Sequence, residues 1–584
     1  MSTTATFCVG TYLTTRLEQL GIRHLFSVPG DYTSDLLEIV DQQSTLRRIG
    51  NCNELNAGYA ADGYARANGL GAVAVTTGVG SFSVLNAIGG AYVEMIPVVV
   101  IIGTLSNLKR LNAINAGELF HHNTGPGDEN RPVFQGVTVA FEQINDPIQA
   151  PAQIDHALTM CISRRRPVVI EIMEDCYYLP CPAPVGALRP VPLFTPLTEL
   201  QSLAPTNKYA KAIDGKVQGA VGEILSRLNN KSLNCIFWVG HELARYGLQD
   251  LFRELLQKTG RPYVSSLLGK AVLPENTPGY LGIYDGVFSQ YTVQENDCMI
   301  ALGVWNTDLN VFGQSVKTPL GTGNPADVLA TRDVVKVGTT LYPQVSLENL
   351  LTELLRQLDG HPVAAAYPAT PPPARPIPAT DQAITYDAFF ACLNGYLTPD
   401  NLVVAEIGLS TFGGSSFLAI NRQNGFLSQA IWASIGWSVP AGLGASFTPG
   451  VRPIVIVGDG AFKLTCQELS TMVACGCNTV VFVLNNRVYA VEQILLNPKP
   501  FQKGSTEKFE AANVLQPWDY VSLMNGFSNN DPQAMSANVN TVGDMQDVLT
   551  QISEHSGAVW LVSINLDERD FPASWLPFVN PKVN

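Results

Sequence analysis

The chain has 584 residues, of which 46% are hydrophobic and 15% are charged, a composition typical of a large folded enzyme and not of a disordered or fibrous chain. A prior of about one domain per 150 residues predicts three or four domains. The formal net charge of −14 argues against nucleic acids and anionic membranes as partners, because both bind concentrated Lys and Arg.

Nothing in the sequence resembles a targeting or membrane segment. Residues 1–6 are polar and lack the basic region and apolar stretch of a signal peptide. The most apolar window, residues 96–103, is far shorter than the roughly 20 residues needed to span a bilayer. The cysteines lack the paired spacing of a zinc site, so we expect reduced thiols. We therefore expect a soluble, cytoplasmic protein without a membrane partner.

In the first third of the chain, apolar residues alternate between helical and strand spacing. We predict helices at residues 12–20, 53–68 and 81–92, and strands at 24–28, 72–76 and 97–102. This alternation is typical of a doubly wound α/β domain, which we place at residues 1–190. The segment Gly78-Val79-Gly80 lacks the third glycine and the acidic residue of a dinucleotide site, so we interpret it as a tight strand-to-helix turn.

Two further α/β domains follow the first. Strand-like segments at 235–239, 263–265 and 298–302 predict a middle domain over residues 191–360. Residues 361–380 are crowded with proline and alanine, and such a segment behaves as an extended linker. Residues 381–584 form the last domain. The fold class we predict is α/β, with three doubly wound parallel-sheet domains.

The last domain contains the most informative pattern in the chain. Apolar runs at 454–457 and 479–484 predict two buried strands, and the intervening residues 461–476 have the spacing of a helix. Asp459 and Asn486 follow the two strands, at the sheet edge where parallel α/β folds bind ligands. Carboxylate and amide oxygens suit Mg²⁺, which usually completes its shell with phosphate and water. The pattern therefore predicts a site for a metal-bridged diphosphate.

Ionisable residues also occur at strand and helix ends of the first domain. Asp31 follows a predicted strand, Glu54 begins a helix, and His121-His122 lies in a glycine- and asparagine-rich loop. Each has an ordinary structural alternative: a turn, a favourable charge at a helix N-terminus, or a solvated loop. Their convergence on one edge of an α/β domain favours a functional role.

Together these motifs resemble those of the thiamine-diphosphate-dependent 2-oxo acid decarboxylases, a family that acts on pyruvate, indolepyruvate, phenylpyruvate and branched-chain 2-oxo acids. The resemblance covers nearly the whole chain and implies pyrimidine-binding, middle and diphosphate-binding domains in that order. It rests on Val28-Pro29-Gly30-Asp31-Tyr32, Asn53-Glu54-Leu55-Asn56, Gly63-Tyr64-Ala65-Arg66, His121-His122, Ile435-Gly436-Trp437-Ser438, Gly458-Asp459-Gly460, Asn485-Asn486 and Tyr489-Ala490-Val491-Glu492.

The resemblance implies a reaction in which thiamine diphosphate stores the electrons released with CO₂ as an enamine, before an aldehyde leaves. Glu54 would share a proton with the pyrimidine ring and thereby activate the cofactor. Asp31, His121, His122 and Glu492 would relay protons in later steps.

The family pattern also implies which residues bind the cofactor and the metal. Ile435 would hold the cofactor bent, since a β-branched side chain is stiff, and the carbonyl of Ala433 would accept its amino group. Mg²⁺ would be bound by Asp459, Asn486 and the carbonyl of Val488, although a valine there would resist positive φ. The remaining cofactor contacts would come from Val79, Gly460 and Ala461.

The expected substrate pocket consists of Thr411, Phe412, Val491 and Leu495. Val491 replaces an isoleucine that is typical of the pyruvate-specific members, so we expect a larger aliphatic or aromatic 2-oxo acid, with pyruvate as the alternative. An apolar pocket discriminates a methylene by only about 1–3 kcal/mol, so several acids could be accepted.

Two other activities remain open from the sequence. One is a carboligating synthase of the acetohydroxyacid type, and the other is a non-catalytic protein that binds the diphosphate. The presence of Glu54 argues against the second. In the family, the first domain of one subunit meets the last domain of another, which implies a homodimer, or a dimer of dimers.

Overall fold

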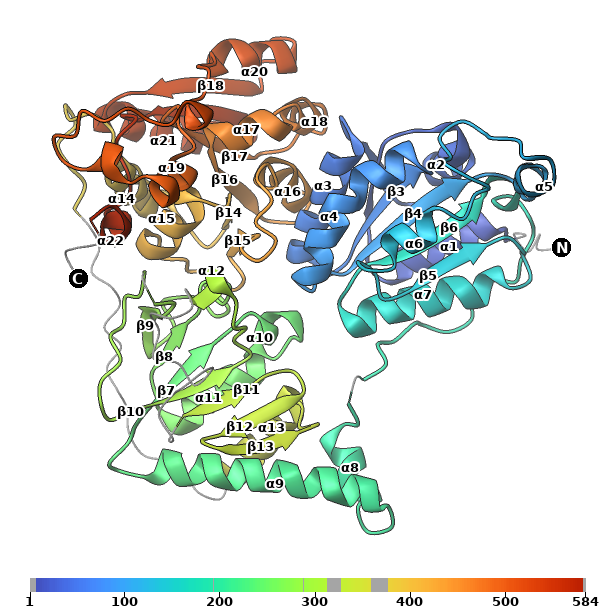
Figure 1. Cartoon of the computed structure of the whole chain (residues 1–584), viewed down its shortest axis with the longest axis horizontal. Coiled ribbons are helices and arrows are strands. Elements are labelled where there is room, and N and C mark those ends of the chain that lie inside the picture. Colours follow the sequence, from blue (N-terminus) through green and yellow to red (C-terminus); the bar gives the residue numbers. More distant parts are fainter. Residues whose placement is uncertain (1–6, 193, 287, 312–326, 359–375, 581–584) are drawn as a thin grey trace.

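The computed structural model describes residues 7–192, 194–286, 288–311, 327–358 and 376–580. Its strands form three sheets, each in its own part of the chain (Figure 1). The predicted linker at 361–380 lies mostly outside the described residues, and its described part, 376–380, contains no helix or strand. The domain limits drawn from the sequence remain predictions.

The first sheet has the order β2-β1-β3-β4-β6-β5, and all of its strands run parallel. Three of its inner strands, β3, β4 and β6, are buried along their whole length, in agreement with their mostly apolar sequences. The strands are β1 His24–Ser27, β2 Arg47–Gly50, β3 Gly71–Thr76, β4 Val98–Thr104, β5 Phe141–Ile144 and β6 Val168–Met173. The helices are α1 Val9–Gln19, α2 Ser34–Gln43, α3 Glu54–Asn68, α4 Val79–Val93, α5 Asn107–Ala116, α6 Asn130–Phe134 and α7 Ala150–Arg164.

The middle sheet has the order β13-β12-β11-β10-β7-β8-β9. It is parallel except at one end, where β12 and β13 pair antiparallel. Its strands are β7 Asn234–Val239, β8 Tyr263–Ser265, β9 Tyr280–Ile283, β10 Asp297–Leu302, β11 Val328–Ala330, β12 Val334–Val337 and β13 Thr340–Pro343. Its helices are α8 Leu197–Leu203, α9 Lys208–Asn229, α10 Glu242–Arg245, α11 Gln249–Thr259, α12 Asp308–Val311 and α13 Leu347–Leu358.

The third sheet, β15-β14-β16-β17-β19-β18, is entirely parallel and repeats the strand order of the first sheet. Its strands are β14 Asn401–Ala405, β15 Phe426–Ser428, β16 Arg452–Gly458, β17 Val480–Asn485, β18 Ala534–Val539 and β19 Val559–Asn565. Its helices are α14 Tyr386–Tyr396, α15 Leu409–Phe417, α16 Ser438–Ala445, α17 Asp459–Thr465, α18 Glu468–Ala474, α19 Ala490–Leu496, α20 Tyr520–Ser528, α21 Val542–Glu554 and α22 Leu576–Val579.

These sheets confirm the predicted α/β class with three sheets in which parallel pairing dominates. One predicted element was wrong: residues 461–476 do not form one helix but two, α17 and α18, which are separated at Cys466-Gln467. Helical spacing of apolar residues cannot reveal this break, because both helices present apolar residues to the core. The break allows α18 to begin with the buried Glu468, whose contacts are described below.

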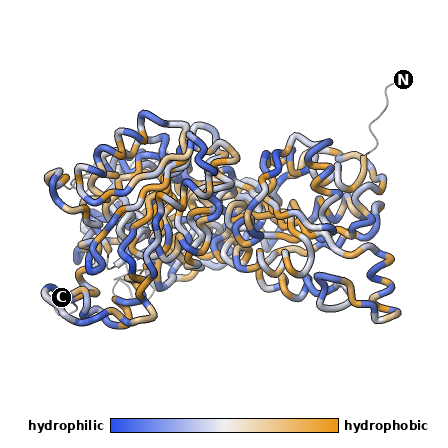
Figure 2. The backbone as a smooth tube through the Cα atoms, turned by 90° about the horizontal axis from the view of Figure 1, so that it is seen from above, coloured by the Kyte–Doolittle hydropathy of each residue, from blue (hydrophilic) through white to orange (hydrophobic). Residues whose placement is uncertain are grey.

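The first and third sheets share one hydrophobic core, in which α3 packs against α16 (Figure 1). A side chain at Gly444 would place its Cβ 1.9 Å from the carbonyl oxygen of Ala60, so this close approach of the two helices requires glycine. Figure 2 shows hydrophobic strands running through the interior of the molecule. No helix in the described part of the chain is long and apolar enough to cross a membrane.

Candidate active site

Asp459 and Asn486 lie side by side at the ends of β16 and β17. The two strands are in register up to Gly458 and Leu484, so the residues that follow them emerge at the same edge of the sheet. Both side chains are buried, at 3% and 2% exposure. The carboxylate of Asp459 accepts hydrogen bonds from the amides of Gly460 at 3.0 Å and Arg487 at 2.7 Å.

The electrostatics of Asp459 fit a divalent cation. Burial raises its pKa to about 6, although the amides of Arg487 and Gly460 act in the opposite direction. Within the described residues, no Lys or Arg forms an ion pair with this carboxylate. A buried carboxylate next to an amide oxygen is a donor set that Mg²⁺ accepts, and the cation would offset the cost of burying the charge.

Val488 does not carry the backbone strain that its sequence suggests. The positive φ in this loop, 64°, falls on Arg487, and Val488 is not among the residues with positive φ. Val488 instead donates its amide to Oδ1 of Asn486 at 3.2 Å and forms an antiparallel bridge with Val514. The valine side chain therefore causes no backbone strain at the position whose carbonyl is expected to bind the metal.

Ala433 occupies a left-handed conformation with φ of 56°, which costs free energy for a residue with a side chain. A buried network holds the segment before it: the amide of Ile431 donates to Glu94 at 2.8 Å, and Glu94 forms an ion pair with Arg66, also 2.8 Å long. Arg66 belongs to one of the motifs that carry the family resemblance. Ile435, two residues beyond Ala433, is 41% exposed.

A cavity of about 270 Å³ lies at this edge of the third sheet, next to the middle domain. Its walls include the predicted residues Phe412, Ala433, Ile435, Asp459, Gly460, Ala461, Asn486, Val488, Val491, Glu492 and Leu495. Thr411 is not among them: it is fully buried, and its hydroxyl donates to the carbonyl of Glu406 at 2.8 Å. Thr411 therefore supports the wall from behind and does not face the cavity.

Several lining residues were not predicted from the sequence, and two of them come from helices outside the predicted motifs. Leu309 comes from α12 of the middle domain, and Tyr386 is the first residue of α14. Neither belongs to a local motif, because tertiary packing alone brings these helices to the edge of the third sheet.

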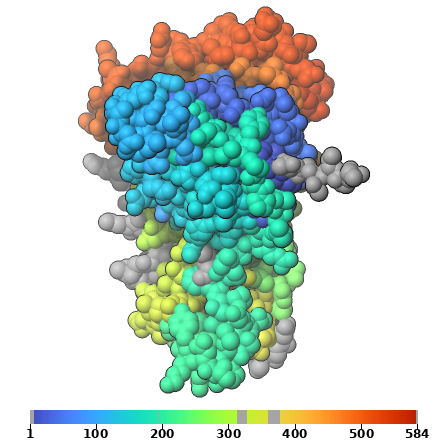
Figure 3. Space-filling view, turned by 90° about the vertical axis from the view of Figure 1, so that its right-hand side faces the viewer, coloured from blue at the N-terminus to red at the C-terminus, as the bar shows by residue number. Residues whose placement is uncertain are grey.

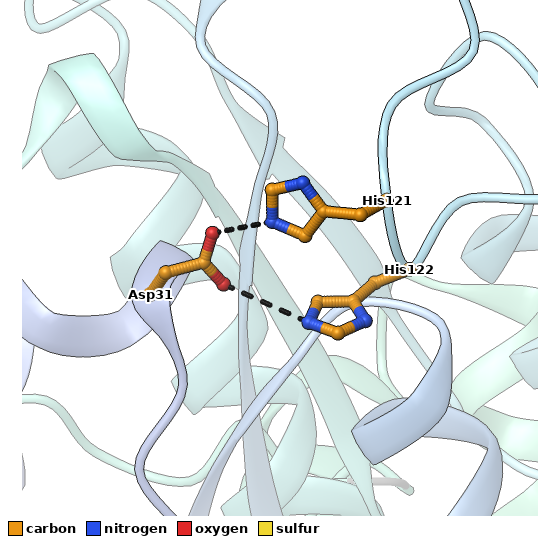
Figure 4. A group of neighbouring side chains, drawn as sticks. All are labelled: Asp31, His121 and His122. Carbon is orange, nitrogen blue, oxygen red and sulfur yellow. Dashed lines mark hydrogen bonds and ion pairs between the residues drawn. The ribbon is translucent and has the colours of Figure 1, made fainter.

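Asp31, His121 and His122 form a cluster in the first domain (Figure 4). Oδ2 of Asp31 lies 2.7 Å from Nε2 of His121, and Oδ1 lies 3.9 Å from Nε2 of His122. The carbonyl of His122 lies so close to Gly78 that a Cβ there would be 1.5 Å from its oxygen. Gly78 is thus needed to bring the histidine loop next to the start of α4.

Glu54 begins α3, and Asn53 caps this helix by accepting the amide of Asn56 at 2.9 Å. The carboxylate of Glu54 lies beside Gly80, next to Val79, which is 57% exposed. The third domain fixes the chain on both sides of Glu54: Glu468 accepts from the amide of Cys52 at 2.8 Å and from the side chain of Asn56 at 3.0 Å. Sequence reasoning missed Glu468 because the contact joins residues more than 400 positions apart.

The two groups of site residues do not meet within one chain. Among the described residues, none from the first domain lines the cavity that holds Asp459. Figure 1 places α5, which precedes the histidine loop, at the outer end of the first domain, whereas α19, which carries Glu492, lies at the far side of the third domain.

Comparisons with known proteins match the chain in three parts. Residues 8–119, 221–358 and 406–563 match the N-terminal TPP binding domain, the central domain and the C-terminal TPP binding domain of the thiamine pyrophosphate enzymes. Pyruvate decarboxylase 1 of Pisum sativum is 30% identical, covering 93% of this chain and 87% of the relative. An alpha-keto-acid decarboxylase of Mycolicibacterium paratuberculosis is 31% identical, and the match covers 99% of this chain and 97% of the relative. A pyruvate decarboxylase of Aspergillus terreus is 31% identical, with coverage of 97% and 95%.

Proposed function

Because this chain belongs to the thiamine-diphosphate-dependent 2-oxo acid decarboxylases, we propose that its active site forms between two copies of the chain. The protein is a carbon–carbon lyase that uses thiamine diphosphate to remove CO₂ from a 2-oxo acid. The role of each site residue, the identity of the metal and the preferred 2-oxo acid are the parts of the function that we propose below.

Within one chain, the predicted site residues of the first domain lie apart from those of the third domain, and this separation supports the proposal. The cavity around Asp459 contains Glu492 but no described residue of the first domain, while Glu54 and the Asp31 cluster lie on that domain. Since the proposed roles of Glu54 and Asp459 concern opposite ends of one cofactor, a second copy must supply the missing half. A twofold arrangement would then complete two sites at once.

Exposed apolar side chains accompany both halves. On the first domain, α5 and the residues just after it expose Leu108, Leu111, Ile114 and Leu119 by 53–67%, and Figure 3 shows this light blue region facing the viewer. On the third domain, Leu495 and Leu496 are 63% and 70% exposed directly after Glu492. Several exposed apolar side chains in one short segment favour burial of that segment against another chain.

We assign the metal and diphosphate to the third domain. Asp459, Asn486 and the carbonyl of Val488 would hold Mg²⁺, and the amides of Gly460 and Ala461 would face the diphosphate. Ile435 would keep the cofactor bent, and the carbonyl of Ala433 would accept its amino group. When bound, the cofactor supplies an electron sink for the bond that CO₂ leaves.

We assign proton transfer to residues of both domains. Glu54 would hold a proton at the pyrimidine nitrogen, beside Val79, and so start activation. Asp31, His121 and His122 would then reach the reacting carbon and its hydroxyl from one side, with Glu492 of the other copy facing them. Such a cluster exchanges protons as a coupled group.

We propose a larger aliphatic or aromatic 2-oxo acid as substrate, with pyruvate as the alternative that two of the named relatives favour. The cavity wall beyond the metal site is formed by Leu309, Phe412, Val491 and Leu495, together with Ile407 and Leu409. All six are apolar, and none offers a donor that would select a short, polar acid.

Mixing two inactive variants tests the interchain site. Glu54→Gln disables only the first domain, and Asp459→Asn only the third. If sites form between chains, a mixed dimer has one site with both defects and one with neither, so random pairing restores about one quarter of the wild-type activity. If each site lies within one chain, the mixture stays inactive. Glu54→Gln mixed with itself is the control.

A further inference from the structure

The cavity in the third domain must accept a diphosphate without help from a basic side chain. No Lys or Arg is among the described residues that line it, whereas two carboxylates, Asp459 and Glu492, are. Beyond the metal, the charge of the diphosphate must therefore be met by neutral hydrogen-bond donors. The hydroxyl groups available on the cavity wall belong to Tyr386, Ser410 and Tyr489.

Tyr386 has the properties of such a donor. Its side chain is 2% exposed, and its hydroxyl makes no hydrogen bond to any residue that the structure describes. Tyr386 lines the cavity, so its unpaired hydroxyl is available to a ligand bound there. A buried phenol without a hydrogen-bond acceptor costs free energy, which an acceptor on a bound ligand would offset.

The backbone of Tyr386 is fixed in place. Its amide donates to Oδ2 of Asp570 at 2.7 Å, and Thr385 caps the same helix by accepting the amide of Ala388 at 3.2 Å. Burial, and then the charges of Asp459 and Asp570, raise the pKa of Tyr386 above its usual value. The group is therefore a neutral donor throughout the physiological pH range, and it lies near the carboxylate of Asp459.

From this placement we infer that the hydroxyl of Tyr386 donates a hydrogen bond to the diphosphate of the cofactor. The inference rests on the proposed function and adds to it a side-chain donor that no motif contains. Tyr386 is a binding residue: it touches the end of the cofactor that takes no part in the chemistry. Its removal weakens cofactor binding and leaves the reaction of the loaded enzyme nearly unchanged.

Calorimetric titration of the cofactor-free protein tests this inference, with Mg²⁺ present throughout. We expect Tyr386→Phe to raise the Kd for thiamine diphosphate about tenfold or more, because hydrogen bonds to charged acceptors are the stronger ones. Inorganic diphosphate, titrated separately, loses affinity by the same factor. The kcat at saturating cofactor stays within about twofold of wild type.

Tyr396→Phe is the matched control, since this tyrosine ends the same helix and its hydroxyl accepts from Arg452 at 3.4 Å, away from the cavity. Its Kd should equal that of wild type. Thermal unfolding of cofactor-free Tyr386→Phe should match wild type, which establishes that the variant folds.

An unchanged Kd for inorganic diphosphate in Tyr386→Phe would overturn the inference. If the Kd for the complete cofactor nevertheless rose, the contact of Tyr386 would lie on another part of the cofactor. Failure of the wild-type protein to bind thiamine diphosphate would instead overturn the proposed function, so the two failures are distinguishable.

Discussion

The carboxylate of Asp31 lies 2.7 Å from Nε2 of His121, although 90 residues separate them. The contact fixes one imidazole of the pair, and His122 lies edge-on to it with ring centroids 4.7 Å apart. Three side chains that can donate or accept a proton thus lie together on one surface of the first domain. This is the side that we propose to face a second copy.

Asp31→Asn should lower kcat by about 100-fold or more, since positioned acid–base groups contribute typically that much. The amide preserves the shape of the side chain but cannot accept the proton, so cofactor binding should be unchanged. Stopped-flow measurement of CO₂ and aldehyde release separates the steps: we expect aldehyde release to slow more than CO₂ release. Equal slowing of both would contradict a late role.

Glu54→Gln should abolish cofactor activation and leave diphosphate binding intact. The amide cannot hold a proton on the pyrimidine nitrogen, so hydrogen–deuterium exchange at the reactive carbon of thiamine diphosphate should fall to the rate of the free cofactor. NMR after acid quench measures this exchange. Wild-type exchange in the variant would exclude Glu54 from the role.

Leu309→Phe should shift substrate preference toward short acids. The larger side chain fills part of the cavity from the middle domain, so kcat/KM for aromatic and branched acids should fall about tenfold, while that for pyruvate changes less. An aldehyde and acyloin assay over a panel of 2-oxo acids gives both numbers. Acyloin without aldehyde from the wild-type protein would favour the synthase alternative.

His24 should make stability depend on pH. Burial, with a smaller effect from Arg47, lowers its pKa to about 4, and its ring stacks on Phe447 at 4.2 Å. Between about pH 6.5 and 4 the unfolded chain binds a proton at His24 that the folded chain does not, so stability falls as pH falls through this window. His24→Phe keeps the stacking and removes the titration, so its melting temperature should depend less on pH. An identical pH dependence in both proteins would contradict this assignment.

Much of the architecture could be predicted from the sequence, because buried parallel strands such as β4 and β16 are continuous apolar runs and Asp459 and Asn486 directly follow two of them. The contacts of Leu309 and Glu468 could not be predicted, since each joins segments that are distant in the sequence. The break before α18 was missed because the helical period continues on both sides of it.

The hydrogen bonds that Glu468 accepts on both sides of Glu54 have a consequence for a dimer built as we propose. In that dimer, Glu54 serves the site whose metal is held by the other copy, yet its helix is anchored by the third domain of its own chain, in which α18 follows α17 and Asp459. The third domain of each copy would therefore hold the metal of one site and position the Glu54 helix of the other. In such a dimer the two sites would be built on shared structural elements.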